Sequence, residues 1–431
     1  MRKFVLAFLK HFKHNTMIFN FTTITLVIIA ILVIDFVLER VLHHLNAKNL
    51  SAEIPEALKG IYKEDEYAKQ QAYTKTNDRF SIYTSSFNLL LILLMFVFGG
   101  FAVVNNIAES VFENPILVSL LFFGIIYVAD TILGIPFDAY KTFVIEEKFG
   151  FNKSTKGIFV TDQIKSLILT AIIGGLIISL IELIYNQTQS LFWILAWVVV
   201  AVFSIFLNMF YSSIIVPLFN KQTPLDEGEL RDAIQKFATS VDFKLDNIYV
   251  MDSSKRSTKA NAYFSGLGKK KRVVLYDTLI NDLSTDEIVA VLAHEIGHYK
   301  HKHTLQMLIV SLLNTLVMLF LLGLFLGNDA LANAFGVEKA NFHINILAFG
   351  LLYTPISVII GVLINKFSRH NEYQADAFAA EHGLGDNLIE GLKKLSVKSL
   401  SNLQPHPWYV SFYYSHPTLL QRINAINKTK K

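Results

Sequence analysis

The sequence predicts an all-α integral membrane protein with a small α+β insert. Of its 431 residues, 52% are hydrophobic and only 17% are charged, a balance that soluble domains rarely show. The cause is a set of long apolar runs, each close to the roughly 20 residues that a helix needs to cross about 30 Å of hydrocarbon. Seven runs predict seven transmembrane helices: 17–38, 87–104, 116–133, 167–185, 192–218, 305–326 and 344–364.

The ends of these predicted spans are not equally well defined in the sequence. The run 17–38 is too long for a removable signal peptide and lacks a convincing small-residue cleavage site, so we expect it to be the first span. The run 116–133 is short and 344–364 contains Pro355, so the ends of these two spans are the least defined.

Between the fifth and sixth spans, the sequence predicts a small α+β unit. Residues 226–240 have the spacing of an amphipathic helix. Residues 247–251, 261–266 and 273–276 are predicted strands, and glycines with the basic cluster 269–272 would form the turn between the last two. The chain then divides into four parts: 1–218 with five spans, 219–304 with the insert and the helix after it, 305–366 with two spans, and 367–431 as a C-terminal segment.

The distribution of lysine and arginine predicts the orientation of the chain. The loops after the first and third spans are rich in lysine, and the positive-inside rule puts them in the cytoplasm, together with the insert and the C-terminal segment. Basic residues at the N-terminus oppose this assignment, but the summed loops outweigh them. The formal net charge of +4 is too small to indicate nucleic acid binding, and no nucleic-acid-binding motif is recognisable.

The segment Leu292-Ala-His294-Glu295-Ile-Gly-His298-Tyr predicts a metal site. Positions i and i+4 of a helix share one face, so His294 and His298 can bind one zinc ion while Glu295 faces the water bound to it. Zinc lowers the pKa of such a water to roughly 7. The alternative is a buried helix whose histidines are satisfied by hydrogen bonds. Two histidines that flank a glutamate make that the weaker interpretation.

Local signals mark this helix. Ser284 and Glu287 form a capping box at its start, and apolar residues follow at helical spacing. Gly297 costs about 1 kcal/mol relative to alanine in a helix interior, which indicates that another segment approaches closely there.

A catalytic zinc site needs a third protein ligand and one open position, and without cysteine that ligand is His, Asp or Glu. In Asn371-Glu372-Tyr-Gln-Ala-Asp376, two acids again lie at i and i+4. Glu372 would bind the metal, and Asp376 would accept a hydrogen bond from the far nitrogen of a ligating histidine. A solvated acidic face is the alternative, and we favour the ligand interpretation. His301 shares the face of the histidine pair and is a minor candidate.

The spacing places this site close to the membrane surface. The helix of His298 would run almost without interruption into the sixth span, which starts about 10 Å farther along it, and Glu372 follows the seventh span closely. The His-Glu-x-x-His motif is typical of zinc proteases, and a protease with its site at this level would prefer lipid-linked or membrane-bound substrates. Asp35, Asp130 and Glu182 lie within spans and indicate either a hydrated cavity or paired structural acids.

Further segments carry a more specific pattern: 135–152, 218–225, Ser254-Lys-Arg-Ser257, Asn261-Ala-Tyr-Phe264 and Ser415-His-Pro417. With the two metal-site segments, they resemble the seven-span integral-membrane zinc metalloproteases of the CAAX prenyl protease type 1 family, over nearly the whole chain. The resemblance implies seven helices around a large water-filled chamber, capped by the metalloprotease region. It implies removal of the last three residues after a prenylated cysteine, and in some members a second cleavage upstream. It also implies that Glu372 is the third ligand and that His416 stabilises the oxyanion.

We therefore expect peptide hydrolysis with one zinc ion per chain. The expected roles are metal ligand for His294, His298 and Glu372, support of a ligand for Asp376, catalysis for Glu295 and His416, and substrate binding for Asn261, Ala262 and Arg422. Glu295 would act as the general base. A structural salt bridge is the alternative for Arg422.

Expected partners are the lipid bilayer and a peptide or protein substrate that is prenylated or membrane-associated. Residues 427–431 lack the di-lysine retrieval pattern of some eukaryotic relatives, so both a bacterial inner membrane and the endoplasmic reticulum stay open. One alternative function is a general quality-control metalloprotease of the membrane. A transporter with an incidental metal site is a remote one, because the sequence shows no internal repeat.

Overall fold

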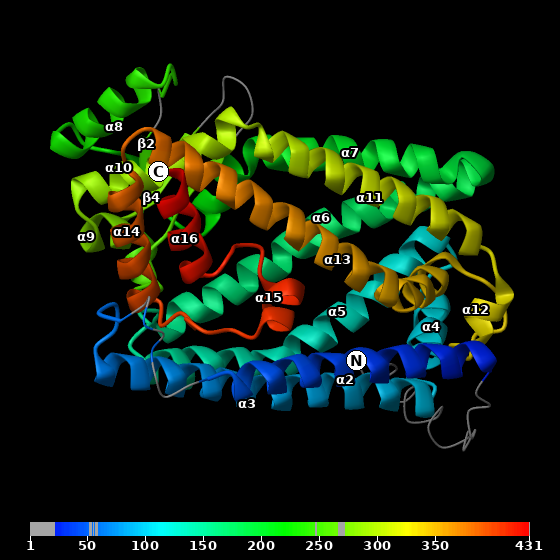
Figure 1. Ribbon diagram of the computed structural model, residues 1–431. Helices are drawn as coiled ribbons and strands as arrows, with labels where there is room; N and C mark the ends of the chain where they lie inside the picture. The colour runs from blue at the N-terminus through cyan, green and yellow to red at the C-terminus, as the bar shows by residue number, and fades with distance from the viewer. Residues whose placement is uncertain are drawn as a thin grey trace.

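The computed structural model describes residues 22–50, 54, 56, 59–245, 248–265 and 272–430, and most of them are helical (Figure 1). Among these residues, six helices are long and apolar enough to cross a membrane. The chain is therefore a multi-pass integral membrane protein, and the predicted fold class is confirmed. The six are α3 (Glu64–Val97), α5 with its π-helical extension (Pro115–Glu146), α6 (Lys156–Thr188), α7 with its extension (Phe192–Leu218), α11 (His303–Phe325) and α13 (Phe342–Glu381).

The first predicted span, 17–38, overlaps helix α2 (Thr23–Lys48). Residues 17–21 and the basic N-terminal residues lie outside the described residues. Helix α2 runs beside α3 (Figure 1), where Arg40 Nη1 lies 3.3 Å from Ser81 Oγ and His43 Nδ1 lies 3.0 Å from Asp78 Oδ1. The predicted count of seven spans is therefore approximate.

Two residues in the left-handed backbone region break helices that the sequence predicted as continuous. The prediction for 87–104 was wrong in its end, because Gly99, with φ 62°, separates α3 from α4 (Gly100–Val111). Lys302, with φ 59°, separates α10 (Thr285–Lys300) from α11. The metal-site helix therefore does not run on into the sixth span.

Helix α13 shows the opposite behaviour. Pro355 does not end it, and the helix continues for 40 residues to Glu381. Its length of about 60 Å is roughly twice the hydrocarbon thickness, so its C-terminal part, residues 365–381, extends beyond the apolar stretch 344–364. The same continuous helix thus carries Glu372 and Asp376.

The predicted α+β insert is present. It contains α8 (Glu229–Ser240), α9 (Asp277–Asp282) and a four-stranded sheet in the order β1-β2-β4-β3. Strands β2 and β4 are parallel, and the outer strands pair antiparallel to them. Of the predicted turn 266–272, residues 266–271 lie outside the described residues, and Arg272 is the first residue of a strand. The strands are β1 (Gln222–Pro224), which the sequence did not predict, β2 (Ile248–Met251), β3 (Ala262–Ser265) and β4 (Arg272–Tyr276).

The sheet and α8 pack on one side of α10, and α13 with α14 (Gly385–Lys398) and α16 (Leu419–Thr429) pack on the other. The predicted apolar face of α10 fills the core under the sheet. This core is the reason why α10 holds a fixed position. Its members include Ile234, Val273, Leu275, Leu279, Ile288, Leu292 and Ile296.

Ion pairs and a hydrogen bond connect the insert to the membrane helices. Arg256 Nε and Nη2 lie 2.7 and 2.8 Å from the two carboxylate oxygens of Asp162 on α6. Lys259 Nζ lies 2.8 Å from Glu146 Oε2 and 3.0 Å from the Tyr73 hydroxyl on α3. The segments between β2 and β3 are therefore fastened to the ends of three spans.

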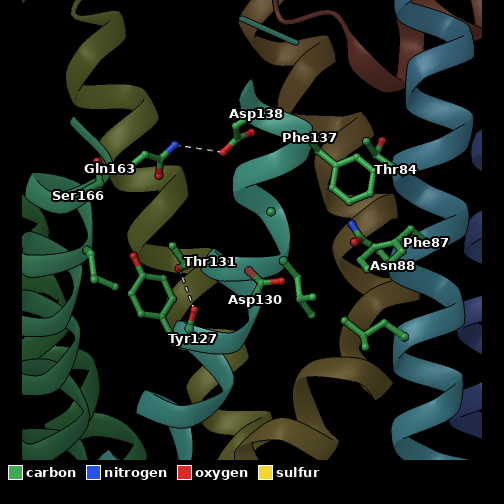
Figure 2. A pocket seen from close by; sticks show the side chains of 14 residues that line it. Thr84, Phe87, Asn88, Tyr127, Asp130, Thr131, Phe137, Asp138, Gln163 and Ser166 are labelled. Atoms are coloured by element: carbon green, nitrogen blue, oxygen red, sulfur yellow. Dashed lines mark hydrogen bonds between the residues drawn. The ribbon is translucent and has the colours of Figure 1, made fainter. Parts of the chain in front are cut away.

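Within the membrane region, a polar recess of about 360 Å³ lies between α3, α5 and α6 (Figure 2). Asp130, Asp138 and Gln163 line it, and Gln163 Nε2 lies 3.3 Å from Asp138 Oδ2. Asp130 therefore faces a cavity, as the first interpretation of the intramembrane acids expects. Glu182 is buried, and its Oε2 has no hydrogen-bond partner among the described residues, so the pairing that the structural alternative expects is not seen for this oxygen.

Candidate metal centre

The two histidines of the metal-site segment sit on a well-anchored helix. The predicted capping box of α10 is present, with Ser284 N donating to Glu287 Oε2 at 2.8 Å and Glu287 N donating to Ser284 Oγ at 3.4 Å. The rings of His294 and His298 lie on one face, with their centroids 4.7 Å apart. Side-chain exposures of 7% for His294 and 19% for His298 show that this face is covered.

The close approach predicted at Gly297 is confirmed. A Cβ atom there would lie 3.0 Å from Ala375 Cα and 3.1 Å from the Ala375 carbonyl oxygen on α13. Glycine lets the two helix backbones touch at this point. This contact brings Glu372, one turn from Ala375, opposite the histidines.

Glu372 completes a group that can hold a metal ion. Its Oε1 lies 3.3 Å from His298 Nε2 and its Oε2 lies 3.5 Å from His294 Nε2. One ligand atom from each of the three residues lies within 4.8 Å of the others, and no other such group occurs among the described residues. Glu372 is 4% exposed, yet its Oε2 has no hydrogen-bond partner in the part of the chain that the structure describes. A buried carboxylate oxygen without a donor calls for a cation.

The positions of the imidazole protons point to the same conclusion. His294 Nδ1 lies 2.9 Å from Asp376 Oδ1, and an ionised carboxylate only accepts, so Nδ1 carries the proton. His298 Nδ1 lies 2.9 Å from His303 Nδ1 and is likewise engaged. With both rings protonated on Nδ1, the two Nε2 lone pairs would point into the group, where they lie 3.1 Å apart and can bind one cation. Two zinc–nitrogen bonds of about 2.0–2.1 Å at a tetrahedral angle would set these atoms about 3.3 Å apart, so the residues fit such an ion.

Behind the ligands lies a buried ion pair. Arg422 Nε and Nη2 lie 2.9 and 2.6 Å from the two oxygens of Asp376, and Arg422 Nη1 lies 3.8 Å from Glu372 Oε2. Burial lowers the pKa of Arg422, but the Asp376 carboxylate outweighs it and holds that pKa above its usual value. Burial and the Arg422 charge also lower the pKa of His294, and the hydrogen bond to Asp376 with the Asp376 and Glu372 charges raises it overall.

The structure thus shows the salt bridge that was the alternative for Arg422. Its side chain is 11% exposed and both ends of its fork contact acids of α13. A role of Arg422 in substrate binding stays a prediction.

The other predicted residues lie around this group. Glu295 is half-buried and lines a cavity of about 180 Å³ with His298, Asn371 and Phe264. The exposed His416 has its Nε2 3.3 Å from Glu372 Oε1. His301, the minor alternative ligand, is not in the metal-binding group.

Asn261 and Ala262 lie at the start of β3, which is an edge strand of the described sheet. Asn261 is exposed, and its side-chain oxygen lies 2.9 Å from Ala262 N. An edge strand offers free backbone groups to an extended peptide.

The sequence analysis did not predict two side chains next to the site, those of His303 and Gln374. His303, 3% exposed, contacts His298, and the Nε2 of His303 lies 2.9 Å from Gln374 Oε1. His303 lies five positions after His298, a spacing that does not share a helix face. Only a break between the two residues, such as a turn before the sixth span, could have revealed the contact.

The chain is similar to known proteins along most of its length. Residues 43–221 match the family described as CAAX prenyl protease N-terminal, five membrane helices, and residues 224–430 match peptidase family M48. The chain is 36% identical to CAAX prenyl protease 1 of Saccharomyces cerevisiae, over 93% of this chain and 95% of that protein. It is 31% identical to the CAAX prenyl protease 1 homolog of Homo sapiens, over 88% and 90%. The crystal structure of S. mikatae Ste24p matches with a TM-score of 0.90 at 36% identity, over 94% of this chain and 99% of that one.

Proposed function

Because the chain belongs to peptidase family M48, in the CAAX prenyl protease type, we propose that this membrane metalloendopeptidase uses zinc to cleave prenylated CAAX-type proteins near their C-termini. The observation that carries the proposal is the group of His294, His298 and Glu372, in which each carboxylate oxygen of Glu372 faces the Nε2 atom of one histidine. Three protein ligands of this kind would leave one position open for a water molecule, as a catalytic zinc site requires.

Zinc in this group would lower the pKa of a bound water to about 7 and polarise the scissile carbonyl. Glu295, which lines the same cavity as His298, would take a proton from the attacking water. It would then deliver that proton to the leaving amine. His416 Nε2, at the rim of the group, would donate a hydrogen bond to the developing oxyanion.

The edge strand β3 supports a way of holding the substrate. An extended peptide can pair with the free edge of β3, and Asn261 and Ala262 would then align its backbone. Phe264 of the same strand lines the cavity that contains Glu295, so a peptide on this edge passes the general base.

The position of the site supports a membrane-associated substrate. Glu372 lies on the extension of α13, and His298 on α10 lies five residues before the start of α11, so the site is next to the ends of two membrane helices. A lipid-anchored C-terminus would reach this level of the membrane surface. The lysine-rich loops support a site that faces the cytoplasm.

The test is cleavage of a farnesylated CAAX peptide and its unprenylated twin by the purified protein in detergent, with and without a zinc chelator. We expect release of the terminal tripeptide from the farnesylated peptide alone, lost with chelator and restored by added zinc. Equal cleavage of both peptides would contradict the prenyl preference and favour general membrane proteolysis. Cleavage that resists the chelator would contradict the zinc mechanism.

A further inference from the structure

The two histidines of the proposed zinc site are supported by different partners. His294 Nδ1 contacts the carboxylate of Asp376. His298 Nδ1 instead contacts another histidine, His303, whose second nitrogen lies 2.9 Å from Gln374 Oε1. His303 is 3% exposed, so bulk water does not substitute for these contacts.

The chain of contacts has a single consistent assignment of protons. A histidine that binds a metal through Nε2 keeps its proton on Nδ1. His298 Nδ1 therefore donates to His303 Nδ1, which must be bare. The remaining proton of His303 lies on Nε2 and is donated to the Gln374 side-chain oxygen, and every donor meets an acceptor.

The backbone explains why His303 reaches His298. Lys302, in the left-handed region, ends α10 and lets α11 begin at His303 in a new direction. Gln374 comes from α13, two residues after Glu372. The contact chain thus ties one ligand of α10 to the first residue of one membrane helix and to the extension of another.

We propose that His303, held by Gln374, is a positioning residue that fixes the tautomer and ring orientation of His298 for zinc binding. This inference rests on the proposed function, because it takes His298 as a zinc ligand. Partners of this kind orient metal-binding histidines, and their loss lowers metal affinity about 10–100-fold.

The test compares three variants of the full-length protein. His303→Phe keeps a ring but removes the acceptor. His303→Asn places an amide oxygen where Nδ1 lies and should rescue the hydrogen bond. His301→Phe is the matched control, because His301 stacks on His303 with centroids 5.4 Å apart and phenylalanine keeps that contact.

Zinc affinity is measured by competition with a chromophoric chelator, and the ligand field by the visible absorption of the Co²⁺-substituted protein. For His303→Phe we expect affinity to fall about 10–100-fold, an altered Co²⁺ spectrum, and a lower kcat at saturating zinc with KM nearly unchanged. His303→Asn and His301→Phe should stay within about threefold of the wild type.

Wild-type affinity and an unchanged Co²⁺ spectrum in His303→Phe would overturn the positioning role while leaving the zinc site in place. Failure of the wild-type protein to bind zinc would instead overturn the proposed function. Where His303→Phe does not fold, Gln374→Leu decides the question. This variant removes only the side-chain oxygen that accepts from His303 Nε2, and unchanged zinc affinity would refute the proposal that Gln374 and His303 position His298.

Discussion

The Nδ1 atom of His294 lies 2.9 Å from Asp376 Oδ1, and this contact links the candidate metal site to a buried ion pair. The same oxygen lies 2.6 Å from Arg422 Nη2. One carboxylate therefore orients a ligand and neutralises a guanidinium, so its loss should affect both metal affinity and stability.

For Asp376→Asn, we expect zinc affinity to fall about 10–100-fold because the acceptor behind His294 loses its charge. Arg422 would lose its hydrogen-bonded counter-charge and keep only the more distant Glu372 at 3.8 Å, so we expect a loss of folding free energy of up to about 3–5 kcal/mol. Chelator competition and thermal unfolding of the purified protein measure the two effects. Asp386→Asn is the control, because its pair with Lys430 is exposed and such pairs contribute about 0–1 kcal/mol. Equal behaviour of the two variants would refute the role of Asp376.

Glu295→Ala should abolish peptide cleavage while the protein still binds zinc. The carboxylate is needed to move the proton from water to the leaving amine, but it is not in the metal-binding group. Tripeptide release and metal content by elemental analysis test this, with Glu381→Ala, in the last turn of α13, as a control that should keep both properties. A Glu295→Ala protein that loses its metal would contradict the assignment of Glu295 as base.

Gly297→Ala should destabilise the protein although alanine is the better helix former by about 1 kcal/mol. The added methyl group would meet the Ala375 backbone at 3.0 Å and force α10 away from α13, which separates the histidines from Glu372. We expect a lower Tm and weaker zinc binding. Gly174→Ala on α6 is the control, since nothing lies within 4 Å of its new atom. If Gly297→Ala is as stable as Gly174→Ala, helices α10 and α13 can move apart without a measurable loss of stability.

Glu287 should make stability depend on acid pH. Burial raises the pKa of its carboxyl, but the hydrogen bond and charge of Lys394 and the capping bonds to Ser284 lower it overall. A carboxyl with a depressed folded-state pKa stabilises the fold above its unfolded pKa of about 4.3, and this contribution is lost as pH falls through the folded-state value.

We therefore expect Glu287→Gln to lower Tm at pH 7 and to flatten the fall of Tm between about pH 5 and pH 3. Thermal unfolding across this range measures the difference from the wild type. Glu390→Gln, at an exposed pair with Lys393, should keep the wild-type slope. If the dependence of Tm on pH is the same in Glu287→Gln as in the wild type, ionisation of the Glu287 carboxyl does not contribute to stability.

The sequence by itself determined the features that depend on local periodicity. Apolar runs long enough for the bilayer located the spans, and the i, i+4 spacing located His294 with His298 and Glu372 with Asp376. The capping box at Ser284 marked the start of α10, because a cap is satisfied within one turn of the chain. These patterns need only a few neighbouring residues.

Tertiary structure decided what depends on backbone direction and on distant partners. The left-handed residues Gly99 and Lys302 broke two predicted helices, and only the second break brought His303 to His298. The pairing of Arg422 with Asp376 joins residues 46 positions apart. Such contacts are fixed by the packing of α10, α13 and α16 against one another, because the free energy of a buried polar contact depends on which segment arrives opposite it and not on the residues beside it in the sequence.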